Sequence, residues 1–364
     1  MKKILFRILL VIIAFNLALS LTRTYSNYHS TLRVKHLPNT FIFDPTTKSI
    51  YLIGEDYKKH LLTYPSVLAS YGVTPINLKL ATDTDLALPD GYQLSYNQGT
   101  ILLSKGQHYL IEGKQEVTKR PISSEVLNLL GYQPDQILEV ELDQLPEKTG
   151  EDYQLSALHP EGSIIRSGED TFLIENRQLR RFPDQIILGS YIDPTYLPLS
   201  ATELDLILPR GNDMELKIGS MFQTENQEYY TIIRENGYLK KQGFSNQATY
   251  RGLGYQTEEA RLVDITELPK ENAKPIIYSY FGKRKLAPVA VLEQKSGQLY
   301  DGSASVDDQG IQQYYWQVNQ SLDWLEGNIL NLTGDQPIDS LRLIVVDKDG
   351  LVDSKIINPI AVVK

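Results

Sequence analysis

The sequence predicts a mainly β protein with four repeats at its centre, a β-sandwich at its C-terminal end and a membrane helix at its N-terminus. The first observation is a strand triplet that recurs at steps of 58, 63 and 58 residues. Its four copies are Tyr51-Leu52-Ile53, Tyr109-Leu110-Ile111, Phe172-Leu173-Ile174 and Tyr230-Thr231-Ile232. The second observation is that each triplet precedes an aromatic-glycine element and then a Leu-Pro stop. A long fixed period is typical of repeats that bury their apolar faces against one another.

The N-terminal sequence MKKILFRILLVIIAFNLALSL has the charge order of an export signal, because three basic residues precede an uncharged run from Ile8 to Leu21. We expect residues 1–21 to form a single-pass signal anchor with its N-terminus in the cytoplasm. The alternative is a signal peptide that is cleaved near Ser20, which yields a secreted protein. Residues 22–36 then form a polar stalk, and the rest of the chain is extracytoplasmic.

Composition narrows the class of protein. The 364 residues carry a net charge of -9, and the 36 lysine and arginine residues are dispersed along the chain. We therefore expect no nucleic-acid partner, since nucleic-acid-binding proteins concentrate positive charge on one face. The sequence contains no cysteine, which excludes disulfide bonds, cysteine-bound zinc and a thiol nucleophile.

Each repeat combines two or three short antiparallel strands with one short helix. The segment SSEVLNLLGY shows the helical part, because Ser123 or Ser124 can cap the start and Gly131 can end it. The predicted repeats cover residues 37–90, 91–146, 155–210 and 216–269. Four such units form either a propeller-like ring or a linear stack. We favour the ring, since no strongly polar terminal cap is visible.

The repeat region resembles short repeats of predicted bacterial surface proteins, in which a "YLIENGKKRPI" hairpin precedes an "LGY" helix end. Here the matching text is YLIEGKQEVTKRPI followed by LLGY. It is also loosely similar to the LGFP-type repeats of cell-wall-associated proteins. The resemblance implies a binding or scaffold module that faces the cell envelope.

The C-terminal segment, residues 270–364, consists of a linker and a predicted sandwich. It contains LYDGSASVDDQGIQQYYWQVN and LRLIVVDKDG, which resemble the two signatures of the polycystic-kidney-disease (PKD) type of immunoglobulin-like domain. The sequence reads WQV from Trp316 onward, where many members of that family have "WDFGDG". The resemblance implies a β-sandwich with Trp316 in its core, and the β-branched runs around an Asp349-Gly350 turn agree with it.

Two groups of residues are candidate sites. Basic pairs near the end of the hairpin in three of the four repeats would form one electropositive face if the repeats close, and this face would bind an anionic envelope polymer. These are Lys119, Arg120, Arg180, Arg181, Lys240 and Lys241. Acidic turns of the sandwich supply hard oxygen ligands that suit Ca²⁺. These are Asp307, Asp308, Asp347 and Asp349. For both groups the structural alternative, solvated edge charges or Asx turns, is favoured.

The sequence shows no catalytic motif in a supporting context. The five histidines are scattered without metal-ligand spacing, and no nucleophile elbow or zinc-protease helix is present. We expect no cofactor apart from the possible Ca²⁺. The prediction is a non-enzymatic, membrane-tethered protein for envelope binding, adhesion or scaffolding, with an envelope polysaccharide or surface protein as partner. The alternatives are a glycan-acting hydrolase or its accessory subunit, whose acid pair is hidden in the repeats, and a structural spacer.

Overall fold

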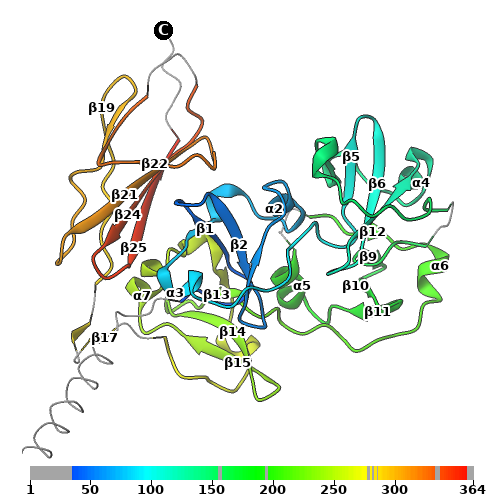
Figure 1. The fold of residues 1–364 in the computed structure, drawn as a ribbon. Coiled ribbons are helices and arrows are strands. Elements are labelled where there is room, and N and C mark those ends of the chain that lie inside the picture. The colour runs from blue at the N-terminus through cyan, green and yellow to red at the C-terminus, as the bar shows by residue number, and fades with distance from the viewer. Residues whose placement is uncertain are drawn as a thin grey trace, which may run out of the picture.

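The computed structural model describes residues 35–154, 158–192, 196–276, 279–280, 283–284, 286–332 and 337–358. The predicted membrane anchor lies outside these residues. None of the helices in the described part of the chain is long and apolar enough to cross a membrane. The described chain is mainly β, as predicted, and its strands form several small sheets (Figure 1).

Four sheets with the same strand order make up the repeat region. In each, three consecutive strands form an antiparallel meander, and the fourth strand lies parallel to the first. Repeat 1 contains β1 (Phe41–Asp44), β2 (Ser49–Ile53), β3 (Lys59–Leu61) and β4 (Lys79–Leu80). Repeat 2 contains β5 (Ile101–Ser104), β6 (Gln107–Glu112), β7 (Thr118–Ile122) and β8 (Ile137–Glu139). Repeat 3 contains β9 (Ile164–Ser167), β10 (Asp170–Glu175), β11 (Gln178–Arg181) and β12 (Leu199–Ser200), and repeat 4 contains β13 (Met221–Gln223), β14 (Tyr229–Glu235), β15 (Tyr238–Gly243) and β16 (Arg261–Leu262).

One short helix stands between the third and fourth strands of every repeat. These helices are α2 (Val67–Ser70), α4 (Ser124–Leu129), α5 (Gln185–Tyr191) and α7 (Gln247–Gly252). The 3₁₀ turns η1 (Pro75–Asn77), η2 (Pro134–Gln136) and η4 (Thr257–Glu259) precede the fourth strand in three repeats. After that strand come α3 (Asp83–Leu86), η3 (Leu142–Gln144), α6 (Glu203–Leu206) and η5 (Ile265–Glu267), one per repeat.

The helices pack on the sheets of their own repeats, and α2 and α5 also reach the next repeat. Val67 and Leu68 of α2 share a buried cluster with Leu102 of repeat 2. Ile187 of α5 packs against Phe222 of repeat 4. These helices have too few residues to be stable alone, so they depend on the apolar sheet that they cover.

A buried imidazole joins repeat 4 to the start of repeat 1. Nδ1 of His36 lies 2.6 Å from Oδ2 of Asp85, and its Nε2 lies 2.9 Å from the carbonyl oxygen of Leu253. Both side chains of the pair are almost fully buried. The hydroxyl groups of Tyr255 and Thr40 lie 3.0 Å apart across the same junction. The last repeat is therefore bonded to the first.

The same set of contacts joins repeat 2 to repeat 3. Nδ1 of His159 lies 2.6 Å from Oδ2 of Asp205, and its Nε2 lies 2.8 Å from the carbonyl oxygen of Leu130. Tyr132 and Ser163 again bring two hydroxyl groups together, at 3.2 Å. Corresponding residues of the two junctions are about 120 positions apart in the chain. The repeats therefore alternate between two kinds, so that repeats 1 and 3 correspond, as do repeats 2 and 4.

The remaining two junctions form a second matching pair. The Ser70 hydroxyl accepts a hydrogen bond from the Asn97 backbone N–H at 2.9 Å, between repeats 1 and 2. The Ser190 hydroxyl accepts one from the Lys217 backbone N–H at 3.1 Å, between repeats 3 and 4. Repeat 1 thus contacts repeat 2, repeat 2 contacts repeat 3, repeat 3 contacts repeat 4, and repeat 4 contacts repeat 1. The order of colours in Figure 1 follows the same path.

The C-terminal part consists of a small hairpin and two facing sheets. The hairpin pairs β17 (Ser279–Tyr280) with β18 (Lys283–Arg284). One sheet contains β19 (Glu293–Ser296), β20 (Leu299–Asp301) and β23 (Ile329–Asn331). The other contains β21 (Ile311–Val318), β22 (Leu325–Glu326), β24 (Leu341–Asp347) and β25 (Val352–Ile357). Trp316 is fully buried between the two sheets, where its indole N–H donates to the Gly327 carbonyl at 2.7 Å.

The strand β24 is buried on both faces. All seven of its residues are buried, although side chains alternate between the two faces of a strand. Leu343 and Val345 face the sandwich core, while Ile344 and Val346 join the apolar cluster of repeat 1. The sandwich therefore shares a core with the repeats.

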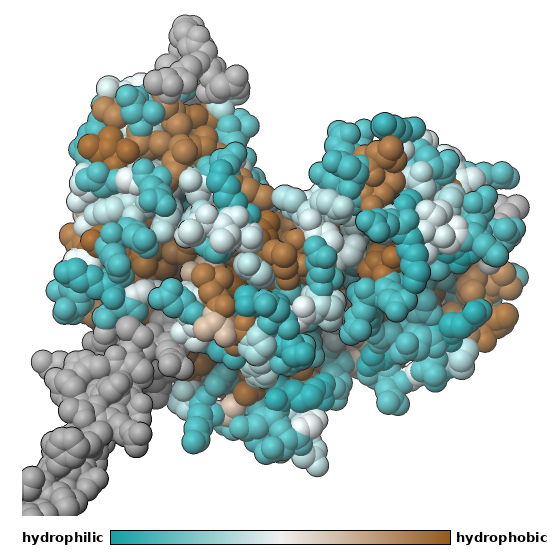
Figure 2. Space-filling view, in the orientation of Figure 1, coloured by the Kyte–Doolittle hydropathy of each residue, from teal (hydrophilic) through white to brown (hydrophobic). Residues whose placement is uncertain are grey.

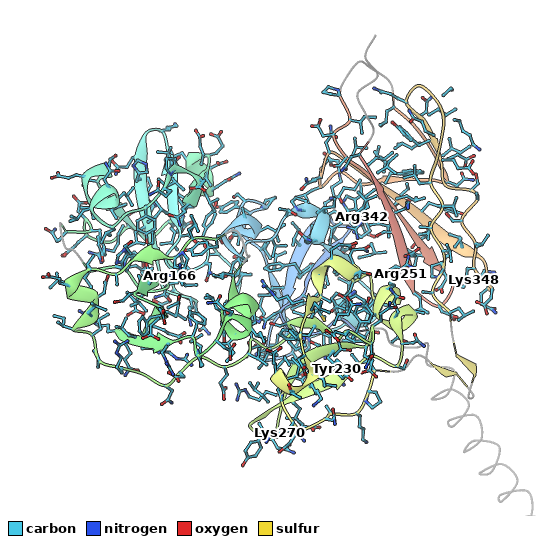
Figure 3. All side chains as sticks on the ribbon, turned by 180° about the vertical axis from the view of Figure 1, so that it is seen from behind. Arg166, Tyr230, Arg251, Lys270, Arg342 and Lys348 are labelled. Atoms are coloured by element: carbon cyan, nitrogen blue, oxygen red, sulfur yellow. The ribbon has the colours of Figure 1, made fainter. Side chains whose placement is uncertain are left out.

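Polar contacts fix the sandwich to repeats 1 and 4. Arg342 of β24 donates to the carbonyl oxygens of Ile76 and Leu78 at 2.7 and 3.2 Å, and burial lowers its pKa to about 10. Arg251 of α7 pairs with Asp353 at 2.6 Å. Both arginines lie where the sandwich meets the repeats (Figure 3).

Replacing His159 by glutamine is expected to lower the free energy of unfolding by about 3–5 kcal/mol, because the buried Asp205 carboxylate loses the ring that contacts it at 2.6 Å. Urea unfolding at neutral pH measures the change. The control is His108→Gln, a substitution on the half-buried face of β6 that should alter stability little. Equal effects of the two substitutions would contradict a special role for the buried pair.

The pH dependence of stability should also report on the His159–Asp205 pair. Burial alone would raise the pKa of Asp205, but hydrogen bonds from His159 and from the Thr202 and His159 backbone lower it below its usual value. Its stabilising contribution is therefore present above the unfolded pKa of about 3.9 and is lost as pH falls through the folded pKa. We expect the stability of Asp205→Asn to depend less on pH below about pH 4. An unchanged acid profile in thermal melts would exclude this contribution.

Candidate functional site

The predicted basic pairs do not occupy equivalent positions, which corrects the sequence interpretation. In repeats 2, 3 and 4 the third strand forms an equivalent isolated β-bridge, at Lys119, Leu179 and Lys241. These three residues therefore occupy the same position of their repeats. Arg181 therefore corresponds to a proline of repeat 2, and Lys240 to a threonine. Since neighbouring residues of a strand face opposite sides, the six side chains do not all point to one face.

All six basic side chains are already engaged. Lys119 donates to the Pro146 and Glu147 carbonyls, and Lys241 donates to the Pro269 carbonyl at 2.6 Å. The others form ion pairs, which are Arg120–Glu112 at 2.9 Å, Arg180–Glu175 at 2.5 Å, Arg181–Asp213 at 3.2 Å and Lys240–Glu235 at 3.0 Å. Their charges are therefore compensated within the protein or held against carbonyl oxygens.

The acidic turns of the sandwich are Asx turns. Oδ1 of the buried Asp347 accepts hydrogen bonds from the Asp349 and Leu351 backbone at 2.7 and 2.9 Å, and Oδ2 of Asp307 accepts one from Gln309 at 2.7 Å. Burial, together with the charges of Asp307 and Asp349, raises the pKa of Asp347 to about 6.

The fourth predicted ligand differs from the other three. Asp308 is exposed to solvent, and its carboxylate accepts from the Gln309 amide at 3.5 Å. No group of three histidine, cysteine or acidic side chains in the described part of the chain is arranged to hold a metal ion.

The two His–Asp pairs have the composition of a catalytic dyad but lack access to a substrate. The second ring nitrogen of each imidazole faces a backbone carbonyl oxygen, and both rings are buried. They hold repeats together instead of presenting a base to solvent.

An open groove of about 620 Å³ lies between repeats 1 and 2. One side is the segment that follows the Leu88-Pro89 pair, with Tyr92, Gln93 and Ser95. The other side is repeat 2, with Gln115 and Val117 near the β6–β7 turn and with Glu147 and Lys148. Sequence reasoning did not find this groove because its two sides come from different repeats.

Tyr92 differs in kind from the residues at the same position of the other three repeats. A side chain of the third strand holds the backbone carbonyl at this position in every repeat, at 2.8–3.1 Å. The side chains are those of His60, Arg120, Arg180 and Gln242, and they contact the carbonyl oxygens of Tyr92, Glu151, Asn212 and Lys274, respectively. Only repeat 1 therefore places an aromatic ring there, and 40% of its surface is exposed.

A separate apolar patch lies around α6 of repeat 3, at the edge of the molecule in Figure 2. Leu197, Leu204 and Ile207 are exposed by 73%, 43% and 77%. The corresponding residues of repeat 1 are Asn77, Thr84 and Ala87, although the capping box at that turn is the same. The turn therefore forms without these aliphatic side chains.

Comparisons with known proteins identify no relative of this chain, since neither models of protein families nor curated proteins match it. The candidate site is thus defined by its geometry alone.

Substitutions of Lys241 and Lys240 compare a lysine that bonds backbone carbonyls with a lysine in solvent-exposed ion pairs. Lys241→Met should lower the free energy of unfolding by about 1–3 kcal/mol, because the Pro269 and Lys270 carbonyls lose their donor. Lys240→Met, next to it on β15, should leave stability nearly unchanged, since its ion pairs are exposed to solvent. Chemical unfolding of the two variants provides the comparison, and equal effects would mean that the buried contact is not special.

Asp347→Asn tests the role of the acidic turn. Because the folded pKa is raised, the carboxyl destabilises the protein as pH increases from about 4 to about 6, and the cost persists at neutral pH. The amide keeps the acceptor oxygen, so we expect equal or higher stability at pH 7, by up to about 3 kcal/mol, and a flatter pH profile. Melting curves with and without millimolar Ca²⁺ check the alternative. A rise in melting temperature that needs Asp347 would establish a calcium site instead.

Proposed function

We propose that this protein is a membrane-tethered, extracytoplasmic protein of a bacterial envelope that binds envelope material and acts as a scaffold. In this proposal residues 1–21 are the anchor, the four repeats form a closed, propeller-like ring, and the PKD-like sandwich is a rigid extension of that ring. The contact of His36 with Leu253 supports closure, since it connects the first repeat to the last. The shared core at β24 supports a fixed sandwich.

The observation that carries the binding function is the broken repeat pattern at Tyr92. A spacer needs no aromatic ring on its surface, and the other three repeats build the same loop with polar or charged residues. A partly exposed aromatic residue beside an open groove is a common feature of binding sites. The groove therefore favours a binding role over a purely structural one.

Fractionation and sedimentation test the proposal. The full chain, produced in a bacterial host, should stay in the membrane fraction after a carbonate wash and should be digested by protease added to intact spheroplasts. The detergent-purified chain should sediment with insoluble envelope material. The matched control lacks residues 1–21 and should be released from the membrane while still binding that material. A protease-protected chain would contradict the topology, and a chain that does not sediment would contradict the binding role.

A further inference from the structure

We infer that the groove between repeats 1 and 2 binds an extended, uncharged polysaccharide, with the ring of Tyr92 stacked against a sugar. This inference rests on the proposed envelope-binding function and names its ligand class. The C–H face of a sugar ring is apolar while its edges carry hydroxyl groups. A complementary site needs one exposed aromatic face and side chains that both donate and accept hydrogen bonds.

The ring of Tyr92 is held in place before any ligand arrives. Nδ1 of His60 lies 2.9 Å from the Tyr92 carbonyl oxygen, and its Nε2 lies 3.1 Å from Asp56. The His60 and Tyr92 rings meet edge to face, with centroids 4.2 Å apart. His60 is itself buried, with 3% of its surface exposed. Because the aromatic platform is ordered in the free protein, binding loses little conformational entropy there.

Gly91 shows that the loop is shaped around this imidazole. A Cβ atom at Gly91 would lie 2.2 Å from Cε1 of His60, which is closer than real atoms approach. A side chain at Gly91 would therefore displace the ring that supports Tyr92. The support and the platform belong to one local arrangement.

The rest of the groove suits hydroxyl groups and not a charged ligand. Gln93 and Gln115 line it from opposite sides, and an amide side chain supplies both donors and acceptors. Its charged lining residues have opposite signs: Lys148, which pairs with Glu116 at 2.9 Å, and the exposed Glu147. Val117 adds apolar surface. The volume of about 620 Å³ lies within the usual range of about 300–1,000 Å³ for ligand sites.

A peptide added as an extra strand fits the groove less well, since that mode needs an open sheet edge. The edge of β3 is already covered, because the Thr63 N–H donates to the Leu94 carbonyl and the Leu94 N–H donates to the Leu61 carbonyl. At β7 the Lys119 N–H likewise donates to the Lys148 carbonyl, and the Gly150 N–H donates to the Lys119 carbonyl.

Calorimetry with uncharged oligosaccharides tests the inference on the detergent-purified full chain. The probes are hexamers of β-1,4-linked N-acetylglucosamine and of β-1,4-linked glucose. We expect at least one to bind, with an affinity that changes little with salt because the oligosaccharide carries no charge. Tyr92→Ala should weaken binding about tenfold or more, whereas Tyr92→Phe should keep it within about threefold, since the aromatic face remains.

The control variant is Tyr238→Ala, which removes a more exposed tyrosine from β15 of repeat 4, outside the groove, and should bind as the wild type does. Melting temperatures verify that the variants are folded. No binding of either hexamer by the wild type would overturn the inference, as would equal losses in Tyr92→Ala and Tyr238→Ala. Salt-sensitive binding of polyglycerol phosphate instead would identify an anionic ligand. If Tyr92→Ala still sediments with envelope material, the proposed function stands and the groove is not its site.

Discussion

The repeat region depends on a buried imidazole that connects its two ends. Both ring nitrogens of His36 face oxygen atoms, one on Asp85 and one on the backbone of Leu253. Separation of the first and last repeats would leave the Leu253 carbonyl oxygen without its partner, and Tyr255 beside it would lose its cover. The sheets carry the apolar packing, while this contact defines which repeat follows which.

The sandwich explains why corresponding repeats differ in sequence. Phe43 of repeat 1 and Arg166 of repeat 3 occupy the same position of the first strand, each opposite the fourth strand of its sheet. Phe43 is fully buried and packs on Trp324 of the sandwich at 4.7 Å, whereas Arg166 is exposed. The backbone is shared, so the difference follows from what covers it. Apolar residues are kept in repeat 1 because the sandwich removes them from water.

The repeats were predictable because strand triplets and Leu-Pro stops are local features, and the burial of Trp316 was expected from the resemblance of its strand to a PKD signature. The register of the basic residues was not predictable in the same way. A period near 60 residues places the short basic runs at about the same point of each repeat. A shift of one residue nevertheless moves a side chain to the other face of a strand, and the period does not define the register that closely. A longer period of about 120 residues was readable from the spacing of His36 and His159. The position of Tyr92 in a groove was not readable, since Gln115 comes from another repeat.

The position of His36 has a mechanical consequence. It lies next to Lys35, where the described chain begins, and therefore directly after the segment that leads to the proposed anchor. Tension applied through that segment would enter the folded protein at the residue that links the first repeat to the last. The load would be shared at once between Asp85 and the backbone of Leu253, before any strand is pulled from its sheet. Such an attachment resists peeling because both sides of the junction must separate together.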